Sequence, residues 1–198
     1  AGEVNSASAH HRDDSRAAVM QTGIMRSLAR ILAMTSLFAA AAAGDTGGLI
    51  DDFADADGRS RLGTPWRLVT DQVMGGVSRG SMQLRELDGR RALCLRGEVS
   101  VANNGGFVQM NLDLSPTATL DASPFSGVRL VARGNGEVYN VHLKTAATTM
   151  PWQSYRADFV AHDAWTEVRL PFTSFTPHRL VPALDTTRLK RLGIVAIG

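Results

Sequence analysis

Residues 66–80 have the sequence WRLVTDQVMGGVSRG, and residues 103–107 repeat its turn chemistry in the shorter form NNGGF. Each is a Gly-Gly turn placed directly beside apolar residues. Because glycine adopts positive φ angles without a Cβ clash, each turn can reverse the chain sharply, and we expect at least two of the four glycines at positive φ. Glycine and asparagine also cluster in turns for steric reasons alone, so a purely structural role is the alternative. The short polar side chains that we expect to be exposed there are Asp71, Ser78, Asn103 and Asn104.

Outside these turns the sequence alternates between apolar and polar residues. Val108, Met110 and Leu112, for example, are each separated by one polar residue. A period of two is expected of half-buried strands. The same period recurs, more weakly in the first two cases, in the segments 82–84, 93–95, 128–132, 139–143, 155–159 and 166–170. Short strands without intervening amphipathic helices predict an all-β fold, an antiparallel β-sandwich.

The last part of the sequence predicts one helical turn and a final apolar strand. We expect the turn from Asp185 to Leu192, with Asp185 as its N-cap, and the strand over Ile194–Ile197. The sequence ends within that apolar segment, so we expect at least one further strand to complete the sheet.

The first 43 residues are expected to lie outside the folded domain, as a disordered or helical extension, and we place the domain at 45–198. Residues 1–24 are polar, lack periodicity and contain no initial methionine, which is consistent with an over-long gene start. The mature protein is expected to begin near Gly44 or Asp45.

Residues 25–43 have the layout of a signal peptide. Arg26 and Arg30 precede an apolar run that ends in three consecutive alanines. The run from Ile31 to Ala43 is shorter than the roughly 20 residues that a transmembrane helix needs, so we expect no retained membrane helix. Export to the periplasm or out of the cell is the prediction. A mitochondrial location is the alternative, because the segment contains Arg and Ser and no acidic residue.

Composition excludes some partners. The 198 residues carry 21 basic and 19 acidic side chains, for a net charge of +2, so we expect no nucleic-acid partner. Cys94 is the only cysteine, which excludes an intramolecular disulfide, and we expect it in the core. A domain of this length can bury a sufficient core without a metal or a disulfide.

The motifs that would indicate catalysis are incomplete. Gly76–Gly80 fits the pattern G-x-S-x-G, but a nucleophile elbow requires a following helix, whereas a period of two continues here. The GNG sequence at 134–136 lacks the third glycine of a dinucleotide site. The histidines have no zinc-site spacing, and the aspartates have no calcium-loop spacing. We therefore expect no enzymatic activity, no cofactor and no metal.

Several motifs, in order along the chain, resemble the complex I intermediate-associated protein 30 family. They are LIDDF at 49–53, Trp66 with DQVMGGVS at 71–78, GEVS at 97–100 with NNGGF at 103–107, RGNG at 133–136, PWQSY at 151–155, and Trp165 with LPFTSF at 170–175. The resemblance covers about residues 49–198. It implies a galactose-binding-like β-sandwich (jelly roll), similar to family 11 carbohydrate-binding modules. The family's mitochondrial members assist assembly of NADH:ubiquinone oxidoreductase, and no catalytic residues are attributed to it.

These observations predict a non-catalytic, chaperone-like assembly-factor domain that recognises a protein partner, an assembly intermediate. We expect recognition through the Gly/Asn rim, which we define as Asp71–Ser78 and Asn103–Gly106. The alternative is the carbohydrate-binding module of an exported protein, with the exposed ring of Trp152 stacking on sugars. Trp66 and Trp165 are expected to pack in the core. The candidate binding residues are Asp71, Met74, Gly75, Gly76, Ser78, Asn103, Asn104, Gly105, Gly106, Trp152, Gln153 and Tyr155.

Overall fold

The computed structural model describes residues 27–39, 48–55 and 57–198, and β-strands predominate in this part of the chain. The strands are β1 (Ser27–Ala39), β2 (Leu49–Asp51), β3 (Trp66–Thr70), β4 (Arg79–Leu87), β5 (Arg90–Val99), β6 (Phe107–Asp113), β7 (Phe125–Arg133), β8 (Val138–Thr145), β9 (Ser154–Val160), β10 (Thr166–Pro171), β11 (Thr176–His178) and β12 (Leu189–Ile197). The short 3-10 helices are η1 (Asp71–Met74), η2 (Ala102–Asn104), η3 (Phe172–Ser174) and η4 (Thr186–Arg188). None of the helices in these ranges is long and apolar enough to cross a membrane.

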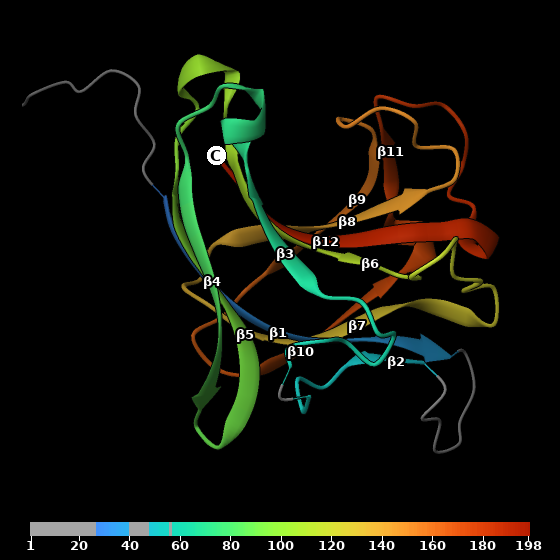
Figure 1. Cartoon of the computed structure of the whole chain (residues 1–198), viewed down its shortest axis with the longest axis horizontal. Helices are drawn as coiled ribbons and strands as arrows, with labels where there is room; N and C mark the ends of the chain where they lie inside the picture. The colour runs from blue at the N-terminus through green and yellow to red at the C-terminus, as the bar shows by residue number, and fades with distance from the viewer. Residues whose placement is uncertain (1–26, 40–47, 56) are drawn as a thin grey trace, which may run out of the picture.

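The strands form two antiparallel sheets that face each other, as Figure 1 shows. The first sheet has the order β10-β7-β1-β5-β4, with β2 also paired to β1, and the second has the order β11-β9-β8-β12-β6-β3. All segments in which the sequence shows a period of two are strands. The all-β antiparallel sandwich predicted from the sequence is therefore confirmed.

The core lies between the two sheets and is built mainly from alternate residues of the strands, although β5 and β12 also bury consecutive residues. On the second sheet, Met110 and Leu112 of β6 are fully buried and pack in the same cluster as Ile194 of β12. On the first sheet, Leu95 of β5 and Leu130 of β7 belong to this cluster. Alternate side chains point away from it, which is what a period of two imposes on a strand.

Strand β1 differs from the expectation for the N-terminal part of the chain. Instead of a disordered or helical extension, Ser27–Ala39 is a strand in the interior of the first sheet. Its first half pairs with β5 and its second half with β7, strands that follow much later in the sequence, and local patterning carries no information about such pairing. The expected cleavage point and residues 1–26 lie outside the described residues, so cleavage stays a prediction.

The C-terminal expectation is confirmed in its first part. Asp185 is the N-cap of η4, and its Oδ1 accepts a hydrogen bond from the Thr187 amide at 3.0 Å. The helical turn ends earlier than expected, because Leu189 already pairs with Leu120 and with Thr145 as strand β12 begins.

Candidate functional site

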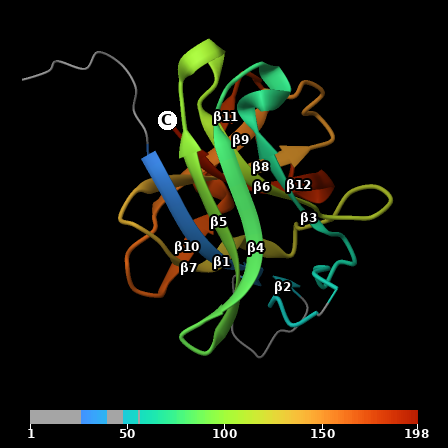
Figure 2. The ribbon, with the colours of Figure 1, turned by 60° about the vertical axis from the view of Figure 1, so that its left-hand side comes forward.

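The two turns of the Gly/Asn rim lie side by side at one end of the sandwich, and a single carboxylate joins them. In Figures 1 and 2 they form the upper loops, after β3 and after β5. Asp71 accepts hydrogen bonds from the amides of Ser78 at 2.9 Å, Gly106 at 2.6 Å and Phe107 at 3.4 Å, and from the Ser78 hydroxyl. The first turn is thus fixed to the second, 35 residues away in the sequence.

Burial of this carboxylate corrects one expectation. Asp71 and Ser78, predicted to be exposed, both have an exposed fraction of 0%. Burial raises the pKa of Asp71, but the hydrogen bonds from Ser78, Gly106 and Phe107 outweigh that effect and hold the pKa below its usual value. The Ser78 hydroxyl also accepts a hydrogen bond from the Ser100 amide at 2.9 Å, so both side chains are committed to holding the turns.

The glycines of the rim serve two different physical purposes. Gly75 and Gly106 have φ angles of 88° and 133°, which confirms the prediction of at least two positive values. Gly76 and Gly105 lie outside that region of φ, yet a Cβ at either position would overlap the side chain of Asp71. Their lack of a side chain therefore makes space for the buried carboxylate.

Apolar side chains form the outer surface of the first turn. Val73 is 72% exposed, Met74 is 51% exposed and Val77 is 46% exposed, and Val101 beside the second turn is also 46% exposed. Exposed apolar side chains gathered on a turn are an uncommon feature on a protein surface. Val73 and Val77 lie within the predicted rim, but the list of candidate binding residues included only Met74 of these four, although the run of apolar residues around the Gly-Gly pair was a usable signal.

A shallow hollow adjoins this surface. It has a volume of about 500 Å³ and lies between η1 and the start of β4. Its lining residues are Leu68, Val69, Thr70, Gln72, Val73, Arg79 and Gly80.

The second turn presents Asn103, which is exposed and has a φ angle of 56°. Asparagine tolerates this left-handed conformation better than most residues, so its identity is explained by the backbone. The side chain of Asn104 lies outside the part of the structure that is described.

Of the three candidate residues at the start of β9, one is exposed and two are structural. Trp152 is 45% exposed. Gln153 holds its own turn, because its Oε1 accepts the amide of Met150 at 3.1 Å and its Nε2 donates to the carbonyl of Arg179 at 3.2 Å. Tyr155 is fully buried, and its hydroxyl donates to the carbonyls of Pro182 and Ala183 at 3.0 and 3.1 Å.

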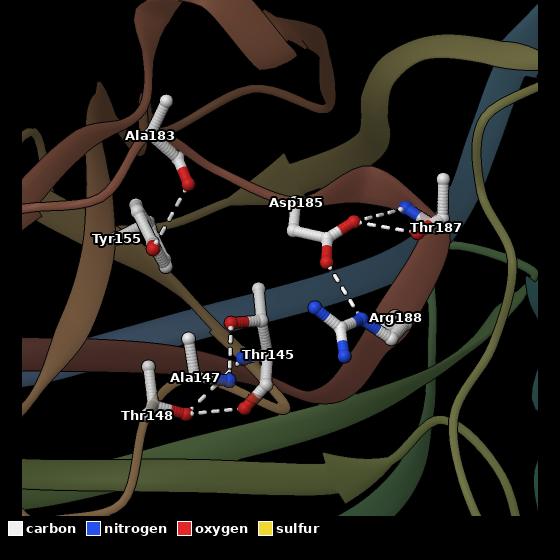
Figure 3. Close-up of polar contacts among 8 residues, drawn as sticks. All are labelled: Thr145, Ala147, Thr148, Tyr155, Ala183, Asp185, Thr187 and Arg188. Carbon is white, nitrogen blue, oxygen red and sulfur yellow. Dashed lines mark hydrogen bonds and ion pairs between the residues drawn. The ribbon is translucent and has the colours of Figure 1, made fainter.

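Figure 3 shows the surroundings of Tyr155, in which loops are held by polar side chains. The Thr148 hydroxyl donates to the carbonyl of Thr145 at 2.7 Å and fixes the turn after β8. Asp185 accepts from Thr187 and pairs with Arg188 at 2.8 Å. Tyr155 anchors the chain before β12, because its ring lies in the core while its hydroxyl donates to the carbonyls of Pro182 and Ala183 in that loop.

The outer face of the second sheet carries a polar row that the sequence did not predict. Arg67, Asn111, Gly193, His142 and Arg156 lie opposite one another on β3, β6, β12, β8 and β9. A Cβ at Gly193 would come within 2.6 Å of the Asn111 amide oxygen, so glycine leaves room there for its neighbours. Strand order creates the row, and strand order is not visible in a linear sequence.

His142, in the middle of this row, is held neutral. Burial, together with the nearby positive charges of Arg156 and Lys144, lowers the pKa of His142 to about 3. Its Nε2 is buried and has no hydrogen-bond partner among the described residues.

Asp51 has a structural role. Asp51 is buried and accepts hydrogen bonds from the Trp66 indole at 2.8 Å and from the Phe53 amide at 2.7 Å. Burial raises the pKa of Asp51, partly offset by these bonds. Trp66 is buried, as predicted. Within the described ranges no three His, Cys, Asp or Glu side chains are grouped so that they could hold a metal ion.

The fold is thus an antiparallel β-sandwich, and the rim at one end of it carries exposed apolar side chains. The chain belongs to the complex I intermediate-associated protein 30 (CIA30) family, whose sequence model matches residues 52–198. This confirms the resemblance stated from the motifs.

Two solved structures with a similar arrangement are family 11 carbohydrate-binding modules from Clostridium thermocellum. One, in complex with a beta-1,3-1,4-mixed-linked tetrasaccharide, has 11% identity and a TM-score of 0.37, with 86% of this chain and 87% of that chain covered. The other belongs to the cellulosomal cellulase Lic26A-Cel5E, with 12% identity, a TM-score of 0.38, and 79% and 86% covered. A comparison with curated proteins finds no match.

Proposed function

We propose that this chain is a non-catalytic domain that binds a protein partner, an assembly intermediate of the kind that the family name describes, through the Gly/Asn rim. The observation that supports this function is the exposed apolar surface formed by Val73, Met74 and Val77, with Val101 beside it. Protein partners bury such side chains, whereas isolated exposed apolar residues need no explanation.

In this proposal the rim residues divide into contact residues and supporting residues. Val73, Met74 and Val77 contact the partner. Asp71 and Ser78 lie behind them and fix the turn in one conformation, which reduces the conformational entropy lost on binding.

The test is capture from an extract of the native host, with the tagged full chain as bait and cross-linking to the rim as the readout. Charged substitutions at the surface, Val73→Glu with Met74→Glu, should reduce capture at least tenfold. Burial of one such apolar side chain contributes about 1.5–3 kcal/mol, and a carboxylate buried in its place would be unfavourable. The melting temperature should stay unchanged, since both residues are exposed.

Val181→Glu is the matched control, because Val181 is an exposed valine, 94% accessible, in a different loop. It should leave capture unchanged. Equal loss of capture in the control and in the rim variant would contradict the proposal, as would full capture by the rim variant.

A carbohydrate is the second candidate ligand, supported by the exposed Trp152 ring and the polar row on the second sheet. The Lys144 ammonium donates to the carbonyl of Pro151 at 2.6 Å, which holds the Trp152 turn against β8, the strand that carries His142. Stacking on an aromatic ring beside amide and guanidinium groups is a common way to bind sugars.

Retention on immobilised polysaccharides separates the two functions. If the second candidate is right, Trp152→Ala and Arg156→Ala should each abolish retention, while Val73→Glu with Met74→Glu leaves it intact. Absence of retention for the unmodified chain on all polysaccharides tried, together with rim-dependent capture of a protein, would favour the first function.

We further propose that the protein is exported, on the basis of the signal-peptide layout of residues 25–43. Intact-mass measurement on the native protein tests this. A species that begins near Gly44 supports export with cleavage, whereas a stable species that retains Ile31 to Ala43 contradicts it.

A further inference from the structure

Strand β1 occupies a position between two otherwise complete strand pairs. Its residues from Ser27 to Ala33 pair with β5, and its residues from Leu32 to Ala39 pair with β7, antiparallel in both cases. On their other sides, β5 pairs with β4 and β7 pairs with β10. Figure 2 shows β1 lying along β5. Without β1, the pairs β5–β4 and β7–β10 would have unpaired inner edges, and β2 would lose its partner strand.

The buried side chains of β5 and β7 determine which segments can occupy this position. On β5, Leu93 and Leu95 are buried in the main core, and on β7, Val128, Leu130 and Ala132 are buried in it. A strand placed between them is therefore expected to supply mainly apolar residues at alternate positions, as Ile31, Ala33 and Leu37 do opposite Leu95, Leu93 and Val128. The unpaired amides and carbonyls of both edges would need a partner, which an extended backbone of almost any sequence provides.

The segment that occupies this position has weak strand preferences of its own. Ala, Leu and Met, which favour helices, dominate the sequence SLARILAMTSLFA, and β-branched residues are few. Its strand conformation therefore depends on pairing with β5 and β7. The same segment has the composition of an export signal, a kind of segment that is removed from mature proteins.

We propose that the groove between β5 and β7 is a strand-binding site, and that Ser27–Ala39 is an exchangeable occupant. The site binds an extended apolar segment antiparallel to both neighbouring strands, by backbone pairing and burial of alternate side chains. It takes this segment from the same chain while the connection is intact, and as a separate peptide once the connection is cut.

The experiment uses the full chain with a specific protease site introduced between Ala40 and Gly47. The probe is a fluorescent synthetic peptide of residues 27–39, and binding is followed by anisotropy and native mass spectrometry. The cut chain should bind one peptide per domain, at least tenfold more tightly than the uncut chain. In the uncut chain the covalently attached segment competes at a high effective concentration.

A pair of peptide variants tests the pairing itself. Ala33 pairs with both Leu93 and Ala132, whereas Ala39 pairs with Phe125 of β7 at the end of the strand. Ala33→Pro, which removes a central N–H, should reduce binding at least tenfold, and Ala39→Pro should reduce it far less.

Hydrogen exchange supplies the second readout. Amides in 93–99 and 125–133 should lose protection when the cut segment is removed, and regain it with the peptide but not with its Ala33→Pro variant. If the cut chain unfolds without the segment, recovery of the folded state by the peptide alone supports the proposal.

Unchanged protection after removal of the segment, with no binding of the peptide, would overturn it. So would a cut chain that dimerises and excludes the peptide, because a second copy would then be the occupant. Failure of the peptide to restore folding, under conditions in which the uncut chain refolds, would also overturn it.

Discussion

At the residue scale, Asp71 shows that a charged side chain in a turn can be fully buried. Three amides and one hydroxyl donate to its carboxylate, so the charge is retained without contact with water. A carboxylate with this many donors is favoured in its charged form, which agrees with the lowered pKa of Asp71.

Asp71→Asn should destabilise the protein by about 2–4 kcal/mol at pH 7, because an amide nitrogen would face amide donors that need an acceptor. The folded-state pKa of Asp71 lies below the unfolded value, so its stabilisation is present above about pH 4 and is lost as the pH falls through the folded-state pKa. In urea unfolding at pH 7, 5 and 3, the difference in unfolding free energy between the unmodified protein and Asp71→Asn should become smaller as the pH falls. Asp163→Asn, at an exposed aspartate, is the control and should change little; a constant gap at every pH would contradict the prediction.

His142 gives a second prediction that depends on pH. Its pKa of about 3 in the folded state lies below the unfolded value of 6.5. Its contribution to stability is therefore present above pH 6.5 and decreases as the pH falls toward 3. In an NMR titration the imidazole signals should stay unchanged from pH 7 to 4, and His142→Asn should lose less stability over this range. An imidazole that titrates near pH 6.5 would show that it is not desolvated.

At the scale of elements, the rim requires glycine for two reasons: positive φ angles, and the close approach of the Asp71 side chain to the backbone. The sequence predicts positive φ values as the reason for both double glycines, and the structure assigns that reason to Gly75 and Gly106. For Gly76 and Gly105 the reason is the carboxylate of Asp71, which occupies the space of their missing side chains. A larger residue at either glycine would therefore displace this carboxylate.

Gly105→Ala should cost about 1–3 kcal/mol, since the new methyl group overlaps Asp71. A double-mutant cycle with Asp71→Ala should be non-additive by at least about 0.5 kcal/mol, because both changes act on one contact. Chemical unfolding of the four proteins provides the measurement.

Gly58→Ala is the matched control for this cycle. Gly58 has a positive φ of 69°, but a Cβ there would meet nothing within 4 Å. Its cost should add to that of Asp71→Ala. Additivity in both cycles would mean that Gly105 and Asp71 do not interact.

At the scale of the whole molecule, the two sheets share one core and should unfold together. Fully buried side chains of both sheets, such as Leu130 of β7 and Leu112 of β6, belong to the same cluster. Neither sheet can bury its apolar face alone, so the sandwich is the smallest stable unit.

Leu130→Ala and Leu112→Ala should each destabilise the protein by about 2–5 kcal/mol and shift one common transition. Tryptophan fluorescence and circular dichroism should report the same midpoint in each variant. Val181→Ala, at a side chain that is 94% exposed, should change stability by less than about 0.5 kcal/mol. Two separated transitions, each moved by one of the two core substitutions, would show that the sheets unfold independently.

The sequence by itself determined the strand class, the position of most strands, the two Gly-Gly turns and the burial of Trp66. These properties depend on periodicity and turn chemistry, which are carried by neighbouring residues in the chain. The N-cap at Asp185 was predictable for the same reason.

Only the tertiary structure decided that Asp71 is buried, that Tyr155 anchors a loop, that a polar row crosses the second sheet, and that Ser27–Ala39 lies between β5 and β7. Each of these depends on pairing or contact between residues far apart in the sequence. Alternation shows which residues of a strand share a face, but it does not show which strand lies beside it. The order of the strands decides which residues donate to Asp71, which residues form the polar row and which strands pair with Ser27–Ala39.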